Sequence, residues 1–226
     1  MKRFWHEVAV TPERGIVLDG RPVRTPGRLP LVLPTDALAQ MVADEWRAVT
    51  DSIDPRAMPM TGLANAAIER VAADPAAFAE TLARYAENDL LCYRAEAPAE
   101  LVARQAAAWD PPLAWAQERY DVRFVVAAGI IHRAQPADTL ARVGAAVAAR
   151  DVFALAALSP ITTLTGSIVL ALGLVEGAFT SDATWKAAHV DESWQAERWG
   201  EDAAAAALLA ERRREFDAAV RFLTAL

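Results

Sequence analysis

Residues 152–175 form a run of 24 residues without a charged side chain, and this run limits the folds open to the chain. A run of that length leaves water, either into a bilayer or into the interior of a folded protein. Ser159-Pro160 interrupts it, hydroxyl side chains dilute it between residues 162 and 167, and no cluster of cations marks a cytoplasmic flank. The run therefore predicts two buried helices of a bundle, broken at Ser159-Pro160, and no membrane insertion.

The N-terminal 34 residues carry the period-two pattern of short strands. Residues 4–10 alternate in polarity, and Asp19-Gly20 separates two short apolar runs. An Asp-Gly pair between such runs indicates a hairpin, because both residues tolerate a positive φ. Four prolines between residues 22 and 34 keep the strands short or at sheet edges. This segment predicts a small antiparallel sheet.

After Pro34 the apolar residues recur with the 3.6-residue period of helices. Thr35 is a candidate N-cap, Pro98 and Pro111 are each expected to open a helix, and residues 122–126 are expected to form a short strand. The predicted fold class is α+β, with a small N-terminal antiparallel β-containing domain packed on a larger C-terminal multi-helical domain. We expect a β-rich domain with one helix at residues 1–52 and a helical domain at residues 53–226.

The charge balance and the single cysteine exclude several classes of function. The formal net charge is −7 and the isoelectric point is near 5.1, so the surface repels nucleic acid and anionic membranes. Cys92 stands alone, which excludes an intramolecular disulfide and favours a reducing compartment. The N-terminal residues contain neither an apolar signal core nor a presequence, so we expect a cytoplasmic protein.

The sequence contains no recognisable catalytic constellation. A P-loop, a dinucleotide fingerprint and a nucleophile elbow are all missing from it. His189 and Glu192 have a helical spacing that suits two metal ligands, but a metal site needs a third and a fourth. We therefore expect a protein that is not an enzyme and that binds neither a metal nor a cofactor.

Residues 190–202 place two tryptophans among five carboxylates and one arginine. The ordinary interpretation is a helix with core tryptophans and solvated acids. The alternative is a binding surface, because large aromatics anchor protein interfaces while surrounding carboxylates steer a basic partner. Residues 176–202 carry seven acidic and two basic side chains, a net charge of −5. The residues predicted to bind a partner are Glu192, Trp194, Glu197, Trp199, Glu201 and Asp202.

Several short motifs, taken together and in order, resemble those of the ATP12 family. The resemblance runs from about residue 3 to about residue 202, and it is specific because of the number of motifs. They are Arg3-Phe4-Trp5, residues 18–26, Leu33-Pro34-Thr35, Glu45-Trp46, Ile53-Asp54-Pro55, Met58-Pro59-Met60-Thr61, Leu63-Ala64-Asn65, Asp89-Leu90-Leu91-Cys92-Tyr93-Arg94, Arg104-Gln105, Trp109-Asp110-Pro111, Thr163-Leu164-Thr165-Gly166-Ser167 and residues 194–202.

The resemblance implies a function and a location. Members of this family are chaperones for assembly of the F1 sector of ATP synthase; they bind the unassembled α subunit before it pairs with β and mask its subunit interface. The implied partner is thus the F1-ATPase α subunit, and the implied fold is a small sheet-containing domain on a larger helical one. Mitochondrial members carry a presequence that this sequence lacks, which points to a bacterial cytoplasmic member. We expect a monomer.

Two other functions stay open at this stage. One is a small-molecule enzyme with an unrecognised pocket between the two domains, lined by Tyr93, Arg94 and Arg104. The other is an adaptor for a different basic protein. Trp46, on the first helix, is expected to be structural.

Overall fold

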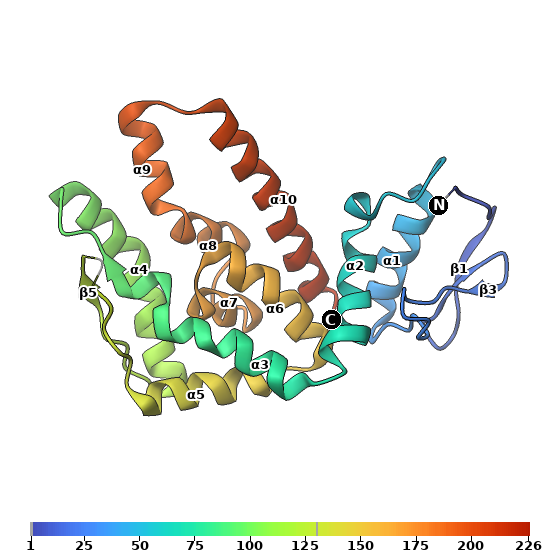
Figure 1. Ribbon diagram of the computed structural model, residues 1–226, viewed down its shortest axis with the longest axis horizontal. Helices are drawn as coiled ribbons and strands as arrows, with labels where there is room; N and C mark the ends of the chain where they lie inside the picture. Colours follow the sequence, from blue (N-terminus) through green and yellow to red (C-terminus); the bar gives the residue numbers. More distant parts are fainter. Residues whose placement is uncertain (1, 130) are drawn as a thin grey trace. The chain divides into compact units, whose positions relative to one another are not determined.

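The computed structural model describes residues 2–129 and 131–226 (Figure 1). Its strands are β1 (Val8–Val10), β2 (Ile16–Leu18), β3 (Arg21–Pro22), β4 (Tyr93–Arg94) and β5 (Ala127–Ala128). Its α-helices are α1 (Asp36–Ala48), α2 (Pro59–Ala66), α3 (Pro75–Ala83), α4 (Ala99–Tyr120), α5 (Ala137–Ala148), α6 (Val152–Thr165), α7 (Ile168–Val175), α8 (Ser181–Ala188), α9 (Val190–Trp199) and α10 (Ala203–Thr224). Shorter helical turns are η1 (Pro55–Ala57), η2 (Ala67–Val71), η3 (Arg84–Asn88) and η4 (Leu90–Cys92). This combination of a small antiparallel sheet and many helices confirms the predicted α+β class.

The chain consists of two compact units, and each is assembled from separate parts of the sequence. The first comprises Met1–Pro75, Asp151–Ala157 and Asp217–Leu226, and the second comprises Ala76–Arg150 and Leu158–Phe216. Helices α6 and α10 each contribute residues to both units. The domain boundary expected between residues 52 and 53 stays a prediction.

A three-stranded antiparallel sheet in the order β1-β2-β3 begins the first unit. Leu18 pairs with Arg21, so Asp19 and Gly20 form a two-residue hairpin loop. Their φ angles are 48° and 75°, as the tight turn between right-twisted strands requires. The Asp19 carboxylate also accepts a hydrogen bond from the Glu7 amide at 2.8 Å, which ties the loop to the residue before β1. The hairpin predicted from Asp19-Gly20 is confirmed.

Helix α1 packs against β1 and β2 and supplies much of the core of the first unit. Thr35 caps it: its hydroxyl accepts from the Leu38 amide at 3.2 Å and donates to the Ala225 carbonyl, near the C-terminus. Trp46 is 8 % exposed and meets Trp5 edge to face, with 5.3 Å between the ring centroids. Trp46 is therefore a core residue, in agreement with the structural role expected for it.

The uncharged run forms α6 and the apolar helix α7, whose residues from Ile168 to Gly173 are all buried. The break between the two helices lies at Gly166-Ser167 and not at Ser159-Pro160, so the position predicted for it was wrong. Gly166 has a φ of 66°, and the Ser167 hydroxyl caps α7 by accepting from the Leu170 amide at 3.1 Å. Pro160 lies inside α6, where its φ suits a helix although its ring removes one backbone donor and crowds the carbonyl four residues earlier. Among the helices of the described residues, none has the length and apolar character to cross a bilayer.

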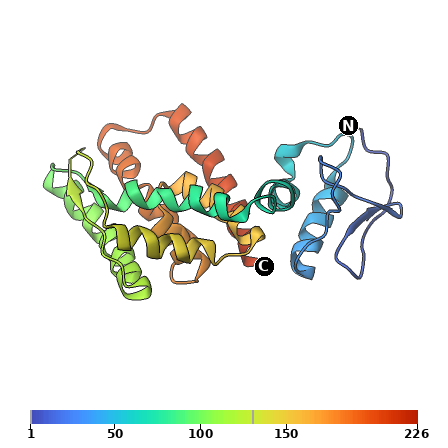
Figure 2. The same cartoon turned by 60° about the horizontal axis from the view of Figure 1, so that its bottom comes forward.

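The second unit is built around α7, with α4 and α8 packed against it. Helix α4 is one continuous helix with Pro111 and Pro112 inside, so the helix start predicted at Pro111 was wrong. The strand expected at residues 122–126 was also misplaced. Ala127 and Ala128 instead pair in parallel with Tyr93 and Arg94. In two views α3 and α5 run side by side within this unit (Figures 1 and 2).

A pair of helical glycines gives a test of the packing around α7. A Cβ at Gly173 would lie 2.0 Å from Cε2 of Phe179, whereas a Cβ at Gly62 in α2 would meet nothing within 4 Å. We expect Gly173→Ala to lower the free energy of unfolding by about 1 to 3 kcal/mol, because the Phe179 ring must move. Gly62→Ala should raise it by about 0.5 to 1 kcal/mol. Urea unfolding of both variants measures the difference, and equal effects would contradict this packing.

Candidate functional site

The acidic, tryptophan-bearing segment lies at the turn between α9 and α10. Helix α9 ends at Trp199, and Gly200 follows with a φ of 90°, a conformation that disfavours any residue with a side chain. The Gly200 amide closes the last turn of α9 by donating to the Ala196 carbonyl at 2.9 Å. Asp202 then begins α10, because its Oδ1 accepts from the amides of Ala204 and Ala205 at 2.8 and 2.9 Å. The sequence Trp199-Gly200-Glu201-Asp202 thus encodes a helix end, a turn and a helix start.

The two tryptophans of α9 have different surroundings. Trp194 is 6 % exposed, whereas Trp199 is 71 % exposed. The rings meet at right angles with 5.2 Å between centroids, and the Arg198 guanidinium lies 5.8 Å from the Trp194 ring. An edge-to-face contact of this kind adds about 0.5 to 1.5 kcal/mol beyond burial. Trp194 therefore supports Trp199 from below, and Trp199 presents its ring to the solvent.

Helix α4 orients α9 through a small charged network. Glu197 pairs with Arg104 at 2.6 Å, Arg104 also pairs with Glu100 at 3.2 Å, and Glu100 lies 3.7 Å from Arg198. Asp191, at the start of α9, accepts from the buried Gln105 amide at 2.8 Å. The hydrogen bond that Arg104 donates to Glu197 is the largest cause that raises the pKa of Arg104. Because these side chains are mostly solvated, each pair stabilises the fold by only a small amount, and their main effect is to fix the orientation of α9.

Two of the predicted residues, Glu192 and Glu201, are exposed carboxylates of another kind. Among the residues that the structure describes, neither one makes a hydrogen bond or an ion pair. Their charge is therefore not neutralised within the chain and can act on an approaching molecule. Together with the exposed Trp199 ring, they form a surface that is acidic and aromatic at once.

The structure thus places the six predicted residues along one helix and the turn that follows it, in three different environments. Trp199 is exposed, and Glu192 and Glu201 are exposed without an ion-pair partner among the described residues. Trp194 is buried, and Glu197 and Asp202 are engaged within the chain. In Figure 1 this turn joins the ends of α9 and α10. The partner-binding role of all six stays a prediction. We refer to them below as the α9–α10 surface.

Asp89 is fully buried and has a structural role that was not predicted from the sequence. Its Oδ1 accepts from the Leu91 amide and its Oδ2 from the Val169 amide, each at 3.1 Å. The carboxylate therefore links η4 to the N-terminus of α7. Burial raises the pKa of Asp89 to about 6, and hydrogen bonds from Ser167 and from backbone amides lower it only in part. An aspartate before Leu90-Leu91 is a signal for a local cap, but no pattern in the sequence indicates the partner 80 residues away.

Glu45 has a similar role in the first unit. Its carboxylate accepts from the Met60 and Thr61 amides at 2.7 and 2.8 Å and from the Thr61 hydroxyl at 2.7 Å. It therefore caps α2 from α1, and burial raises its pKa despite these hydrogen bonds. The two carboxylates position helices, and this explains why acids appear inside the motifs Glu45-Trp46 and Asp89-Leu90.

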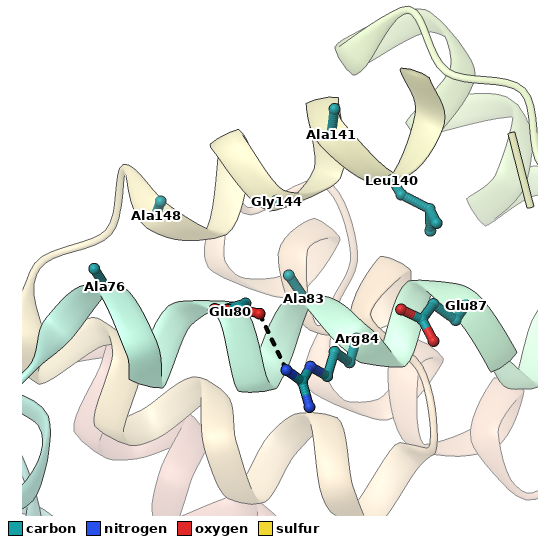
Figure 3. Close-up of a pocket in the computed structure, with 9 residues that line it drawn as sticks. All are labelled: Ala76, Glu80, Ala83, Arg84, Glu87, Leu140, Ala141, Gly144 and Ala148. Carbon is teal, nitrogen blue, oxygen red and sulfur yellow. Dashed lines mark hydrogen bonds and ion pairs between the residues drawn. The ribbon is translucent and has the colours of Figure 1, made fainter. Parts of the chain in front are cut away.

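A groove of about 420 Å³ lies between α3 with η3 and α5, and its floor is formed mainly by alanines and Gly144 (Figure 3). Its charged groups are Glu80, Arg84 and Glu87, and Glu80 is paired with Arg84 at 3.0 Å on a solvated helix face. Among the described residues, no group of three or more His, Cys, Asp and Glu side chains is arranged to hold a metal ion.

The three side chains considered for an enzyme pocket are each engaged separately. Arg94 pairs with Asp110 at 2.8 Å, and its guanidinium lies 5.2 Å from the Trp109 ring. Arg104 belongs to the network with Glu197, while the Tyr93 hydroxyl lies 3.1 Å from both Asn88 and His132. Their contacts are those of side chains that join neighbouring elements of one unit.

Comparison with known proteins places this arrangement in a family. The family model described as ATP12 chaperone protein matches residues 2–117. The crystal structure of Atp12 from Paracoccus denitrificans is 42 % identical, with a TM-score of 0.94, and the match covers 99 % of this chain and 97 % of that one. The chain belongs to the ATP12 family.

Two further solved structures extend the comparison. An aspartate-to-lysine variant of the P. denitrificans protein is 42 % identical, with a TM-score of 0.93, and the match covers 99 % of this chain and 97 % of that one. A candidate chaperone from Agrobacterium tumefaciens is 43 % identical, with a TM-score of 0.92, and the match covers 99 % of this chain and 85 % of that one. The family resemblance drawn from the sequence motifs is therefore confirmed, and the chain is a member of a chaperone family with bacterial relatives.

The capping role of Asp202 can be separated from its charge. Asp202→Asn keeps an oxygen that accepts from the Ala204 and Ala205 amides, whereas Asp202→Ala removes it. We expect Asp202→Ala to lower the free energy of local opening at the start of α10 by about 1 kcal/mol, and Asp202→Asn to change it little. Amide hydrogen exchange at Ala206, which bonds to the Asp202 carbonyl, measures this opening. Unchanged exchange in Asp202→Ala would show that the cap is dispensable.

The buried carboxyl of Asp89 predicts a pH dependence of stability. Its pKa of about 6 in the folded protein lies above the ordinary 3.8, so the folded state binds this proton more tightly than the unfolded chain. Its contribution is full below about pH 4 and is lost as the pH rises through about 6. Between these limits, the free energy of unfolding of the parent relative to Asp89→Asn should fall by about 3 kcal/mol. Urea unfolding at a series of pH values tests this, and a constant difference would refute it.

Proposed function

We propose that this ATP12-family protein assists the assembly of ATP synthase by binding the unassembled α subunit of the F1 sector and masking its subunit interface. Family membership supports the coarser part, a chaperone for ATP synthase assembly. The finer part, the α subunit as partner and the α9–α10 surface as its binding site, rests on the family resemblance of the sequence and on the chemistry of that surface.

The observation that carries the proposal is the exposed ring of Trp199, supported by buried Trp194 and flanked by the unpaired carboxylates Glu192 and Glu201. A tryptophan that is 71 % exposed leaves a large apolar area in water, which is unfavourable unless a partner covers it. The flanking carboxylates favour a partner that presents basic groups around an apolar patch. An unassembled subunit with an uncovered interface offers a surface of this type.

A chaperone of this kind must release the subunit when the assembly partner arrives, and the α9–α10 surface suits moderate affinity. Exposed charges at the rim mainly raise the rate of encounter, and a buried aromatic anchor mainly sets the lifetime of the complex. Trp199 is a single large anchor, and Glu197 is already held by Arg104. The surface therefore attracts a basic partner quickly without retaining it for long.

The remaining parts of the proposal concern catalysis, location and assembly. We propose that the protein has no catalytic turnover of its own, acts as a monomer and works in the bacterial cytoplasm. The relatives from Paracoccus denitrificans and Agrobacterium tumefaciens support a bacterial setting. The acidic net charge of −7 agrees with a protein partner and disfavours nucleic acid.

Glu201→Lys tests the electrostatic part of the proposal. We expect the free energy of unfolding to change by no more than about 0.5 kcal/mol, because the side chain is exposed. Capture of the unassembled α subunit at low salt should weaken by about three- to tenfold, and its remaining affinity should depend less on salt. Glu118→Lys is the matched control, since Glu118 is an exposed carboxylate roughly 20 Å along α4 from Arg104.

The anchor is tested in the same capture assay with Trp199→Ala. Because Trp199 is exposed, truncation should cost little stability, about 1 kcal/mol or less, while capture should fall further than in Glu201→Lys. If Glu201→Lys captures the α subunit as well as the parent, the α9–α10 surface is only solvated and the site assignment fails. If co-purification recovers a different basic protein in place of the α subunit, the protein is an adaptor for that partner.

A further inference from the structure

The first half of α10 is apolar and largely exposed, with only Ala206 and Leu209 half-buried on one side. Residues 203–210 are six alanines and two leucines, with no polar side chain among them. Throughout the described stretch 203–215 no residue is buried, and Leu208 is 51 % exposed. A helix segment that is apolar all round is normally covered by protein. This one continues directly from Trp199 through the α9–α10 turn.

Alanine is abundant throughout the chain, so an alanine-rich helix does not by itself indicate a binding surface. Helix α5 and the first half of α10 differ in how much of each is buried. Helix α5 is also rich in alanine, but it buries Thr139, Val143 and Val147 on one face and leaves its alanines solvated on the others. The first half of α10 has no buried residue, and only Ala206 and Leu209 are half-buried. It stays helical through the high intrinsic propensity of alanine and the Asp202 cap, and most of its apolar side chains, Leu208 among them, are exposed.

The charged side chains at the two ends of this segment differ in whether they form ion pairs within the chain. At the N-terminal end, Glu201 and the nearby Glu192 are unpaired among the described residues. At the C-terminal end, Arg213 pairs with Asp182 at 2.6 Å, and Arg214 lies 3.8 Å from Glu211. The segment therefore offers apolar surface along its length and free negative charge at one end.

We propose that residues 203–210 of α10 dock as an apolar helix into a groove on the same partner that binds the α9–α10 surface. This inference rests on the proposed function and states the chemistry of the partner: an apolar groove with basic side chains at the end that receives Glu201. Small alanine side chains let the helix backbone approach the groove closely, and Leu208 fills its deeper part. A helix bound in a groove contacts it with side chains that are three and four residues apart.

A second copy of this chain is a less suitable occupant. Two copies carry −7 each, and the free carboxylates of one copy would need free cations on the other. Two of the three arginines that follow the segment, Arg213 and Arg214, are instead paired within their own chain. A basic partner satisfies the free carboxylates, and a second acidic chain does not.

The test uses neutral substitutions that leave the electrostatics unchanged. Ala203→Gln combined with Ala207→Gln places two polar side chains one helical turn apart on the exposed segment, and glutamine keeps helix propensity. The matched control is Ala141→Gln with Ala145→Gln, which has the same spacing and exposure on α5. Capture of the unassembled F1 α subunit by the double α10 variant should weaken by about tenfold, while the α5 control should equal the parent.

Amide hydrogen exchange on the full-length protein supplies the second measurement. Adding the α subunit should slow exchange at residues 203–210 as well as at the turn around Glu201. If capture needs Glu201 but the double α10 variant binds like the parent and residues 203–210 gain no protection, this inference fails and the proposed function stands. If the α subunit is not captured at all, both fail. If the parent self-associates in sedimentation experiments and the double α10 variant does not, a second copy covers the segment and the proposed partner is wrong.

Discussion

The burial of α7 is the constraint on which the second unit depends. Residues from Ile168 to Gly173 are all buried, and such a helix needs neighbours on every side. Helices α4 and α8 supply them, and Asp89 satisfies the Val169 amide at the start of α7, where no helical carbonyl is available. The Trp109 indole then donates to the Ala187 carbonyl at 2.7 Å and fixes the end of α8 against α4. The direction in which α9 leaves this assembly, and with it the position of Trp199, follows from these contacts.

Local sequence patterns were sufficient to predict those features of the fold that depend only on neighbouring residues. The hairpin at Asp19-Gly20 needs two positive φ angles, and the cap at Thr35 needs one hydroxyl, so both could be predicted from neighbouring residues. The helix boundaries predicted at Pro111 and Pro160 were wrong. A proline inside a helix removes a backbone donor, but the helix continues through it when packing of the remaining residues holds the helix in place. The pairing of Tyr93 with Ala127 joins strands 34 residues apart and depends on the tertiary fold. Strands of two residues are too short for a sequence period to indicate this pairing.

The candidate site was easier to find than to interpret. Its six residues are close in sequence, so their composition alone identified the segment. Their separate environments required three dimensions: Trp194 is buried under Trp199, Glu197 is held by Arg104 from α4, and Asp202 caps α10. The apolar pattern of α9 does not show which of these residues are buried, because the only apolar residues of the helix are two tryptophans, a valine and an alanine. Exposure of Trp199 is set by the glycine that ends the helix immediately after it.

An exposed tryptophan beside an uncovered apolar helix is a liability for a protein at high concentration, because such surfaces associate. The charges around it counter this tendency. Unpaired Glu192 and Glu201 repel a second acidic chain at close range, and the net charge of −7 repels it at longer range. In the proposed complex the same charges attract the basic partner, so a single arrangement disfavours self-association and favours the capture that we propose. Because residues 203–215 contribute no buried side chain to the folded protein, this surface can change in affinity with little effect on stability. The proposed function, a chaperone with a transient partner, requires exposed binding residues of this kind outside the core.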